Sequence, residues 1–402
     1  MNVAIFATSD FPDGTATAYR LRMLGRCLVE ENVGCYICLI HPSTKGRDET
    51  LSSDDQSVDG ITFFFATGRN KRPIQRSARI IEVLKGWFGS VRFLWRLRKR
   101  QSIDAILLFT PNFVKVWPII LYGGILRIPL FSEVCEIRSS MVDQHVNVST
   151  ILKLGNQVTE TLIPLLSRGV IAISRPIRDF YVRKGVKKED VIIIPALVET
   201  SQFSIESSDK VPPLENSRYF LSSGSLNEKE GLSYLLEALS KLRETHEDVS
   251  LVLTGGIKDA EQLTIIGMAK EYDVSNAIVF TGMLTREELA WAYQNAQGLL
   301  ACRVDSKFAQ YGFPNKLVEY LASGTPVILT PIGDIGAYLR DPYDAYFAEA
   351  RSGESIAVKM MEVLSNPNQA RVVGRSGQEV AFSHFERRMH SRTLTAFLQD
   401  RL

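Results

Sequence analysis

Two short stretches place glycine, proline and charged residues at a spacing that suits a phosphate group. In the first, YGFPNKLVEYLASG, Pro314 is suited to a helix start and is followed at once by Asn315 and Lys316. The unpaired N–H groups of a helix start attract an anion, and Lys316 adds a positive charge. Glu319, one turn further along, is either an ordinary helix glutamate or an acceptor of hydrogen bonds from paired ribose hydroxyls. The stretch as a whole favours a site for a phosphorylated, diol-bearing ligand.

The second stretch, YFLSSGSLNEKEGLSYLL, has the order strand, glycine-containing turn and helix. Gly224 allows the backbone to approach a ligand closely. Lys229 is either placed to reach a diphosphate from the loop or is a solvated loop lysine.

A third stretch, TSDFPDGTATAYRL, carries Gly14 in a loop that opens a helix, so it also favours an anion. It lacks the G-x-G-x-x-G fingerprint of dinucleotide-binding folds. This absence argues against a nicotinamide or flavin enzyme.

The elements that position these stretches follow a repeated pattern of short apolar runs and longer amphipathic runs. Runs such as VAIFA and AILLF are rich in Val, Ile, Leu and Phe, as parallel strands covered on both faces are. Helical patterns, for example in residues 231–244 and 285–296, separate them. The alternation occurs twice, which predicts an α/β fold with two Rossmann-like, doubly wound domains that face each other across a ligand cleft.

The expected domain boundaries follow the polar stretch ETSQFSIESSDKVPPLENS. Residues 1–200 form an N-terminal Rossmann-like domain, 201–217 a linker and 218–380 a C-terminal Rossmann-like domain. Residues 381–402 form a last helix, which no strand follows and which we expect to pack back on the N-terminal domain.

Composition is that of a soluble globular protein, with 45% hydrophobic and 23% charged residues. Lys and Arg outnumber Asp and Glu in residues 1–200, and the reverse holds in residues 201–402. The spacing of Cys35 and Cys38 puts them on opposite faces of a strand, so buried cysteines are favoured over a metal site. An odd count of five cysteines with no paired pattern, together with the lack of a signal-peptide pattern, predicts a cytoplasmic location.

The segment 79–100, RIIEVLKGWFGSVRFLWRLRKR, mixes aromatic and basic side chains, among them Trp87 and Trp95. This mixture suits the interface of an anionic membrane, on the inner face of which the protein would lie peripherally. The alternative is an ordinary helix that covers the sheet. No known nucleic-acid module accompanies these charges, so nucleic acid is not expected as a partner.

Motifs in a fixed order make the sequence similar to retaining glycosyltransferases of family 4, which have the GT-B fold. They are the loop after the first strand, GVIAISRPIRDFYVRKGV, VIIIPALVETSQF, GSLNEKEGLSYLLEAL, IVFTGMLTREEL and FPNKLVEYLASGTPVI. They cover nearly the whole chain. The run P-N-K-L-x-E-Y resembles a subset of the family that often builds bacterial surface polysaccharides.

The resemblance implies roles for several residues. Lys229 corresponds to the lysine that contacts the donor diphosphate, and Glu319 to the second glutamate of the family's paired-glutamate motif, which holds the ribose. Gly14 corresponds to the loop glycine near the donor phosphates. Pro314, Asn315 and Lys316 fall in the segment where backbone meets phosphate and sugar.

Two positions depart from the family pattern. Tyr311 stands where many members have the first glutamate, and Ser225 stands where many have an arginine that pairs with the diphosphate. The contact to the donor sugar therefore falls to Tyr311 or to one of three neighbours. These neighbours are Gln310, Lys307 and Asp305.

The N-terminal domain is expected to bind the acceptor. In EVCEIRSS, Glu133 and Glu136 follow a strand, so they are expected to face the cleft and to orient the acceptor hydroxyl or act as a base. The alternative for each is a structural or exposed carboxylate. Arg20 and Arg138 are either contacts to an acceptor phosphate or surface charges.

The resemblance implies transfer of a sugar, with retention, from a nucleoside-diphosphate sugar to a hydroxyl of a lipid-linked or polysaccharide acceptor. No cofactor is expected, and no metal, because no Asp-x-Asp pair follows a strand. Two alternatives remain open. One is a nucleotide-sugar 2-epimerase, and the other is a non-catalytic member that binds sugar nucleotide or acts as a scaffold.

Overall fold

The computed structural model describes residues 1–9, 11–12, 14, 16–41, 56–69, 73, 75–109, 112–143, 150–203 and 209–402. The chain divides into two compact units. Unit 1 contains Met1–Leu197, Tyr311–Phe313 and Arg387–Leu402, and unit 2 contains Val198–Gln310 and Pro314–Glu386. Within the described ranges, no helix is both long enough and apolar enough to cross a membrane. Residues 204–208 of the expected linker lie outside these ranges.

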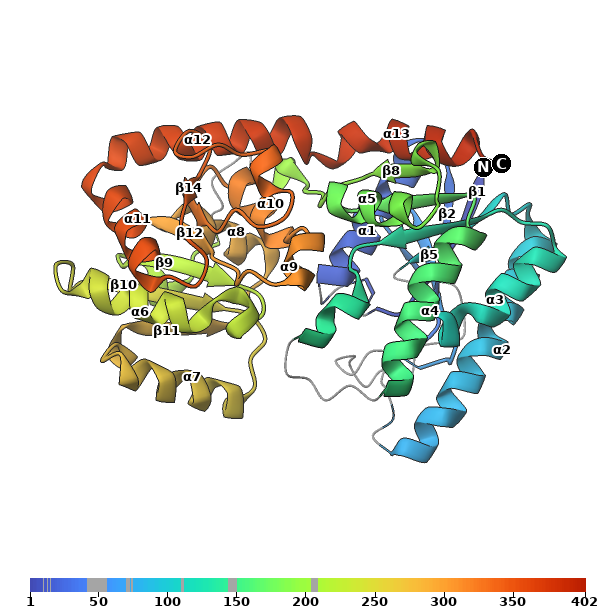
Figure 1. Cartoon of the computed structure of the whole chain (residues 1–402), viewed down its shortest axis with the longest axis horizontal. Coiled ribbons are helices and arrows are strands. Elements are labelled where there is room, and N and C mark those ends of the chain that lie inside the picture. Colours follow the sequence, from blue (N-terminus) through green and yellow to red (C-terminus); the bar gives the residue numbers. More distant parts are fainter. Residues whose placement is uncertain are drawn as a thin grey trace. The chain divides into compact units, whose positions relative to one another are not determined.

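Unit 1 is built on an eight-stranded sheet (Figure 1). In sheet order its strands are β3 (Gln56–Val58), β4 (Ile61–Phe65), β2 (Gly34–Leu39), β1 (Asn2–Ala7), β5 (Ala105–Phe109), β6 (Leu130–Val134), β7 (Gly169–Ala172) and β8 (Val191–Ile193). All neighbours pair in parallel except β3, which pairs antiparallel with β4. The apolar pattern does not predict β3, because it is short and polar. Asp59 and Gly60 both have positive φ in the tight turn that joins β3 to β4.

Helices cover both faces of this sheet. They are α1 (Ala16–Glu30), α2 (Arg76–Arg100), α3 (Phe113–Ile125), α4 (Thr150–Leu166), α5 (Arg175–Arg183) and α13 (Arg387–Gln399). Alternate residues of β1 enter different cores: Val3, Ile5 and Ala7 join one apolar cluster. Ala4 and Phe6 join another, which contains residues of α2 and α3. This two-faced burial is what a doubly wound sheet requires.

Helix α13 completes one of these cores. Leu394, Phe397 and Leu398 are buried in the same cluster as residues of α1, and α13 packs against α1. The last helix of the chain is therefore part of unit 1, although more than a hundred residues of unit 2 precede it.

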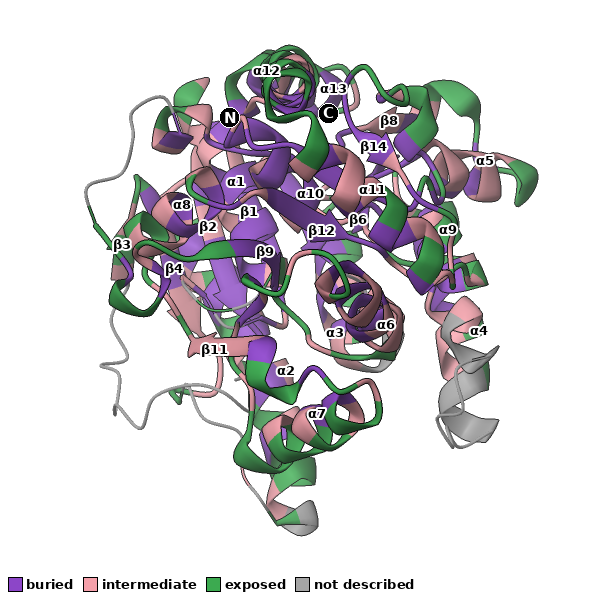
Figure 2. Cartoon of the chain, turned by 90° about the vertical axis from the view of Figure 1, so that its left-hand side faces the viewer, coloured by how far each residue is buried: buried purple, intermediate pink, exposed green. Residues whose placement is uncertain are grey.

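Unit 2 contains a six-stranded, all-parallel sheet. In sheet order its strands are β11 (Ile278–Gly282), β10 (Val249–Thr254), β9 (Arg218–Ser223), β12 (Gly298–Ala301), β13 (Val327–Leu329) and β14 (Tyr346–Phe347). The helices are α6 (Leu232–Arg243), α7 (Asp259–Glu271), α8 (Arg286–Gln294), α9 (Lys307–Tyr311), α10 (Asn315–Ala322), α11 (Gly353–Ser365) and α12 (Pro367–His384). Strands such as β9 and β12 are buried, whereas many helix surfaces are exposed (Figure 2).

The predicted fold class, two doubly wound α/β units, is confirmed. The strand order reverses direction between β1 and β5 in unit 1, and between β9 and β12 in unit 2. In open parallel sheets, ligands bind beyond the carboxyl ends of the strands at such a reversal. The cysteine prediction also holds, since Cys35 and Cys38 are buried in different clusters and all five cysteines are free.

Candidate functional site

The loops that follow β9 and β12 meet at the strand-order reversal of unit 2. Gly231 has φ of 76°, and a Cβ atom there would lie 2.1 Å from the carbonyl oxygen of Cys302. The backbone N–H of Val304 donates to the carbonyl of Lys229 at 3.1 Å. Only glycine allows this close approach, so the loop with Lys229 is held against the end of β12.

A cluster of three charged side chains lies on these loops. The Nζ atom of Lys316 is 2.7 Å from one carboxylate oxygen of Glu230, and Nε of Arg303 is 3.4 Å from the other. Burial alone would raise the pKa of Glu230, but Lys316 and Arg303 hold that pKa below its ordinary value. Burial alone would lower the pKa of Lys316, but Glu230 keeps it raised. The cluster is therefore fully ionised near neutral pH, with one positive charge in excess.

Helix α10 carries Lys316 and is anchored to the end of β9. The Tyr320 hydroxyl accepts from the backbone N–H of Ser223 at 2.7 Å, and Lys316 donates to the Ser223 carbonyl at 3.3 Å. Pro314 is the residue that precedes the helix, and Asn315 is its first residue. The sequence predicts Pro314 as a residue of the first helical turn, whereas in the structure it directly precedes that turn. Proline suits both positions, so the sequence does not distinguish them.

Glu319 lies one turn into α10 and is half-buried. Burial raises the pKa of its carboxyl group to about 7, and the guanidinium of Arg286 opposes this only in part. A carboxyl group with such a pKa is partly ionised near neutral pH. Its ionised form is suited to accept hydrogen bonds from donors of a ligand.

Lys229 and Gly224 lie on the β9 loop, as the sequence predicts. The Nζ atom of Lys229 is 5.0 Å from the centroid of the Phe308 ring, and the side chain is half-exposed. Gly224 has φ of 93°, is exposed, and has open space where a Cβ atom would stand. The backbone at Gly224 is therefore accessible to a ligand.

Tyr311 is grouped with unit 1, whereas Lys316 and Glu319 belong to unit 2. Its carbonyl accepts a hydrogen bond from the Ser174 hydroxyl, and its ring packs edge-on against Phe180 at 5.6 Å. In the segment before it, the Gln310 amide donates to Asp305 at 2.7 Å. Both Tyr311 and Gln310 thus have protein partners in this structure.

Glu133 lies within β6 and not after it, which corrects the expectation that it faces a cleft. Its side chain is fully buried and accepts from Nε of Arg20 at 2.7 Å. The remaining guanidinium nitrogens of Arg20 donate to the carbonyls of Ile194 and Pro195. Arg20 is only 2% exposed, so both alternatives expected for it, a contact with an acceptor phosphate and a surface charge, are wrong in this structure. The pair instead links α1, β6 and the segment after β8.

Glu136 and Arg138 lie just beyond β6, and Glu136 is exposed. They line a hollow together with Asn156, Thr159, Glu160 and Tyr181. Its volume is about 20 Å³, which is room for one hydroxyl group or one water molecule.

Gly14, another site residue predicted in unit 1, has φ of 132°, but its neighbours Asp13 and Thr15 lie outside the described residues.

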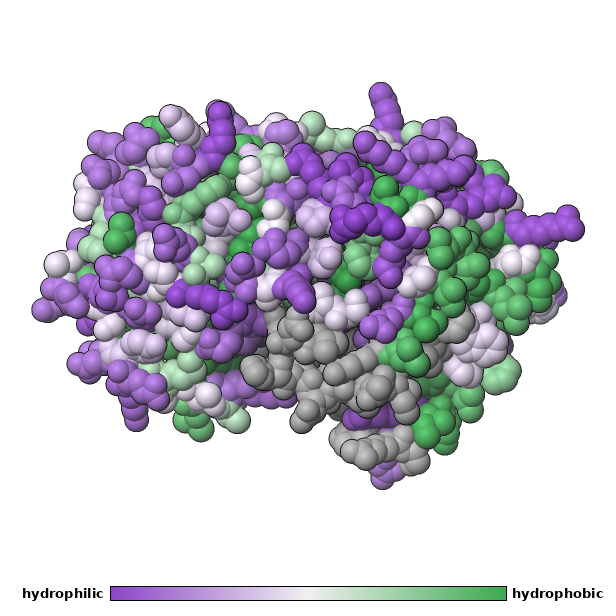
Figure 3. Space-filling view, viewed as in Figure 1, coloured by the Kyte–Doolittle hydropathy of each residue, from purple (hydrophilic) through white to green (hydrophobic). Residues whose placement is uncertain are grey.

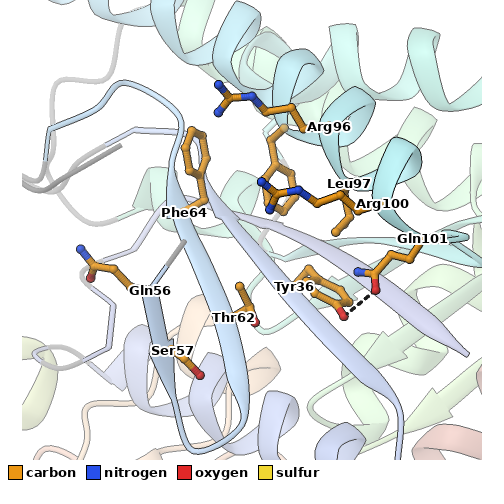
Figure 4. Close-up of a pocket in the computed structure, with 10 residues that line it drawn as sticks. Tyr36, Gln56, Ser57, Thr62, Phe64, Arg96, Leu97, Arg100 and Gln101 are labelled. Atoms are coloured by element: carbon orange, nitrogen blue, oxygen red, sulfur yellow. Dashed lines mark hydrogen bonds between the residues drawn. The ribbon is translucent and has the colours of Figure 1, made fainter. Parts of the chain in front are cut away.

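A larger cavity of about 510 Å³ lies along the β3–β4–β2 edge of the unit 1 sheet, beside the last turns of α2 (Figure 4). It is lined by aromatic and polar residues of β2, β3 and β4 and by Arg96 and Arg100. At the edge of this cavity, the hydroxyl of Tyr36, near the start of β2, donates to the side-chain oxygen of Gln101 at 3.0 Å. The cavity shares no lining residue with the hollow beside Glu136 and contains no predicted site residue, so it is separate from the predicted site.

The two tryptophans predicted to meet a membrane differ in exposure. Trp87 packs edge-on against Trp117 of α3 with ring centroids 5.4 Å apart. Trp95 is 47% exposed, and Lys99 Nζ lies 3.8 Å from its ring centroid. Trp95 is therefore the more accessible of the two.

Sequence reasoning missed Glu230 and Arg303 as members of the charged cluster. Both carry a local signal, because Glu230 precedes the close-approach residue Gly231 and Arg303 is the second residue after β12. Their proximity to Lys316 has no local signal.

Comparison with known proteins connects this geometry to an enzyme class. Residues 204–380 match the family model "Glycosyl transferases group 1". The glycogen synthase of Mycobacterium tuberculosis is 26% identical over 163 residues, which are 40% of this chain and 38% of that protein. The mannosylfructose-phosphate synthase of Agrobacterium fabrum is 24% identical over 229 residues, 54% of this chain and 49% of that protein. The matched regions thus span less than half of these two relatives.

Solved structures resemble the chain over its full length. Sucrose-phosphate synthase from Thermosynechococcus elongatus superposes with a TM-score of 0.76 at 18% identity, over 99% of this chain and 98% of that one. HepE of Anabaena, solved in complex with UDP and glucose, has a TM-score of 0.71 at 14% identity over 100% of both chains. Residues 204–380, which hold the Lys316–Glu230–Arg303 cluster, thus match the glycosyl transferases group 1 model, and the whole chain has the GT-B fold.

Proposed function

We propose that the chain is a retaining glycosyltransferase that moves a sugar from a nucleoside-diphosphate sugar to a hydroxyl of a lipid-linked or polysaccharide acceptor. The observation that carries the proposal is the net positive cluster of Lys316, Arg303 and Glu230 at the β9–β12 reversal, inside the family match. Retention of configuration and the surface-polysaccharide role follow from the resemblance to the P-N-K-L-x-E-Y subset. UDP is the favoured nucleotide, because HepE was solved with UDP and with UDP-glucose.

The donor is assigned to unit 2. Lys229, Lys316 and Arg303 would stabilise the negative charge that grows on the leaving diphosphate, in a field preorganised by Glu230. The start of α10 at Asn315 would add its N–H groups. Glu319 would accept hydrogen bonds from the ribose hydroxyls, and the Gly224 backbone would lie against the donor.

The acceptor is assigned to unit 1. Glu136 is the better candidate to orient or deprotonate the acceptor hydroxyl, because it is exposed beside a hollow the size of a hydroxyl, whereas Glu133 is buried. Arg138 of the same hollow would contact an acceptor phosphate. Gly14 would approach the donor phosphates, and Tyr311 the donor sugar, as the resemblance implies. Segment 79–100 would hold the protein peripherally on the inner face of an anionic membrane.

The first experiment is donor turnover and binding with a panel of UDP-, GDP-, ADP- and TDP-sugars. One donor should bind and slowly release its diphosphate, and Glu319→Ala and Lys229→Ala should each abolish this. Lys210→Ala is the matched control, because Lys210 is an exposed lysine of unit 2, outside the cluster, that pairs with Glu215 at 3.1 Å. An epimerised free nucleotide sugar would reveal the 2-epimerase. Binding without any turnover would favour the non-catalytic alternative, and no binding at all would refute the site.

A further inference from the structure

Three neighbouring helices of unit 1 expose apolar side chains at helical spacing. Each helix repeats them every three or four residues, so they lie on one side of it. We call this set the apolar face. It comprises Ile80, Ile81, Leu84, Phe88 and Trp95 of α2, Trp117, Leu121 and Ile125 of α3, and Leu154, Val158, Leu162, Leu165 and Leu166 of α4. Their exposure ranges from 37% at Val158 to 76% at Phe88.

The apolar face is continuous. Helix α2 packs against α3, and α3 against α4, while the Trp87–Trp117 contact fills the joint between the first two. Hydrophobic atoms gather over these helices in the space-filling view (Figure 3). Soluble monomers rarely expose so large a contiguous apolar surface unless it binds a membrane or a protein.

The charges beside the face favour a membrane as the occupant. Helix α2 carries a basic flank of Lys85, Arg92, Arg96, Arg98, Lys99 and Arg100. Its acidic residue, Glu82, is only 7% exposed, so its carboxylate is largely withheld from the helix surface. Apolar and tryptophan side chains beside exposed lysine and arginine match the acyl and headgroup layers of an anionic bilayer.

We infer that α2, α3 and α4 together dock in the plane of an anionic membrane, as one three-helix surface. This goes beyond the aromatic-basic helix of segment 79–100, because eight of the thirteen side chains belong to α3 and α4. The described helices are too short or too polar to span a bilayer, which fits insertion into one leaflet surface.

Helix α4 connects this surface to the acceptor hollow. Asn156, Thr159 and Glu160 line the hollow beside Glu136, whereas Leu154, Val158 and Leu162 of the apolar face lie on the other side of the same helix. Docking would place a lipid-linked acceptor with its chain in the bilayer and its headgroup near Glu136. This last step rests on the glycosyl transfer of the proposed function, whereas the docking itself does not.

Vesicle flotation of the full chain tests the inference. Wild-type protein should float with phosphatidylglycerol-containing vesicles and much less with pure phosphatidylcholine. Leu121→Gln/Ile125→Gln on α3 and Leu162→Gln/Leu165→Gln on α4 should each weaken partitioning at least about tenfold. Leu263→Gln is the matched control, because Leu263 is a 68% exposed leucine of α7 in unit 2. Circular dichroism should show that all variants are folded.

Two results would overturn the inference. If the α3 variant and the α4 variant both partition into vesicles as strongly as wild-type protein, membrane binding is restricted to α2. A concentration-dependent dimer in sedimentation velocity, broken by the same variants and without vesicle binding, would make the face a protein interface. Diphosphate release from the donor in the absence of vesicles is measured in parallel. If wild-type protein floats with vesicles but releases no diphosphate, the proposed glycosyl transfer alone is defeated. If it releases diphosphate but does not float, membrane docking alone is defeated.

Discussion

The Nζ atom of Lys316 lies 2.7 Å from the carboxylate of Glu230, and this ion pair joins the start of α10 to the loop after β9. The two side chains are 13% and 18% exposed, so the pair is shielded from solvent but reachable from the end of the sheet. Arg303 on the far side of Glu230 leaves the group with excess positive charge. A diphosphate would therefore meet cations whose positions are already set, with little reorganisation.

Replacement of Lys316 tests whether this cluster holds the donor. Lys316→Gln should raise the Kd for UDP about tenfold, which corresponds to about 1.4 kcal/mol of lost binding free energy. It should also reduce the dependence of Kd on ionic strength, because one cation is removed. Isothermal titration calorimetry at two salt concentrations measures both effects. The exposed Lys210→Gln should match wild type, and an unchanged Kd for Lys316→Gln would remove Lys316 from the donor site.

The raised pKa of Glu319 predicts a pH dependence of donor binding. Below pH 7 the carboxyl group is largely protonated, and above it the carboxylate can accept from both ribose hydroxyls. Affinity for UDP-glucose, whose diphosphate diester does not titrate in this range, should therefore rise between pH 6 and pH 8. Glu319→Gln should show a flat profile. A flat wild-type profile would argue against a ribose contact.

The raised pKa of Glu319 has the opposite effect on the stability of the ligand-free protein, which should fall as the pH rises. Because the folded state raises the pKa of Glu319 above its ordinary value, the native state is favoured when the group is protonated, and this advantage is lost as the pH rises through 7. Ligand-free thermal unfolding should show a decline in Tm as the pH rises from about 4.5, the ordinary pKa of the group, to about 7, and the decline should level off above 7. The decline should be smaller in Glu319→Gln.

The buried pair of Arg20 and Glu133 should matter for stability, and the exposed Glu136 for activity. Glu133→Gln leaves a buried guanidinium without its counter-charge, which should cost about 3–5 kcal/mol of unfolding free energy. Glu136→Gln should change stability by less than about 0.5 kcal/mol but should lower turnover with an acceptor. Urea unfolding and steady-state kinetics separate the two. Equal stability of both variants would contradict the assignment of Glu133 as a structural residue.

Gly231 should tolerate no side chain. Gly231→Ala combines a positive φ with a contact of 2.1 Å to the Cys302 carbonyl, so the loop that carries Lys229 and Glu230 must move. We expect a lower Tm and weaker UDP binding. Gly185→Ala in unit 1 is the matched control, since Gly185 shares the positive φ without any close atom and should cost only the backbone strain, about 1–3 kcal/mol. Comparable loss of UDP affinity in both variants would contradict the close-packing argument.

The fold and the local segments of the candidate site were readable from the sequence. Buried parallel strands such as β1 and β5 are continuous apolar runs, and each helix start carries its own signal within a few residues. Gly224, Lys229 and Glu319 accordingly lie on the predicted loop and helix. The burial of Glu133 was not readable, because β6 is covered on both faces and all five of its residues are buried, and because its partner Arg20 is 113 positions away in the sequence.

Pairings between distant residues were decided by the tertiary structure alone. Arg20 and Glu133 are 113 positions apart, and their contact exists only because β1 and β6 lie in one sheet under α1. Lys316 meets Glu230 and Arg303 because the strand order brings the ends of β9 and β12 together. Likewise, the sequence indicates one amphipathic helix at 79–100. The apolar face is recognised only in the structure, where α2, α3 and α4 pack side by side. Periodicity specifies which side of an element is apolar, but only packing determines which apolar sides remain uncovered.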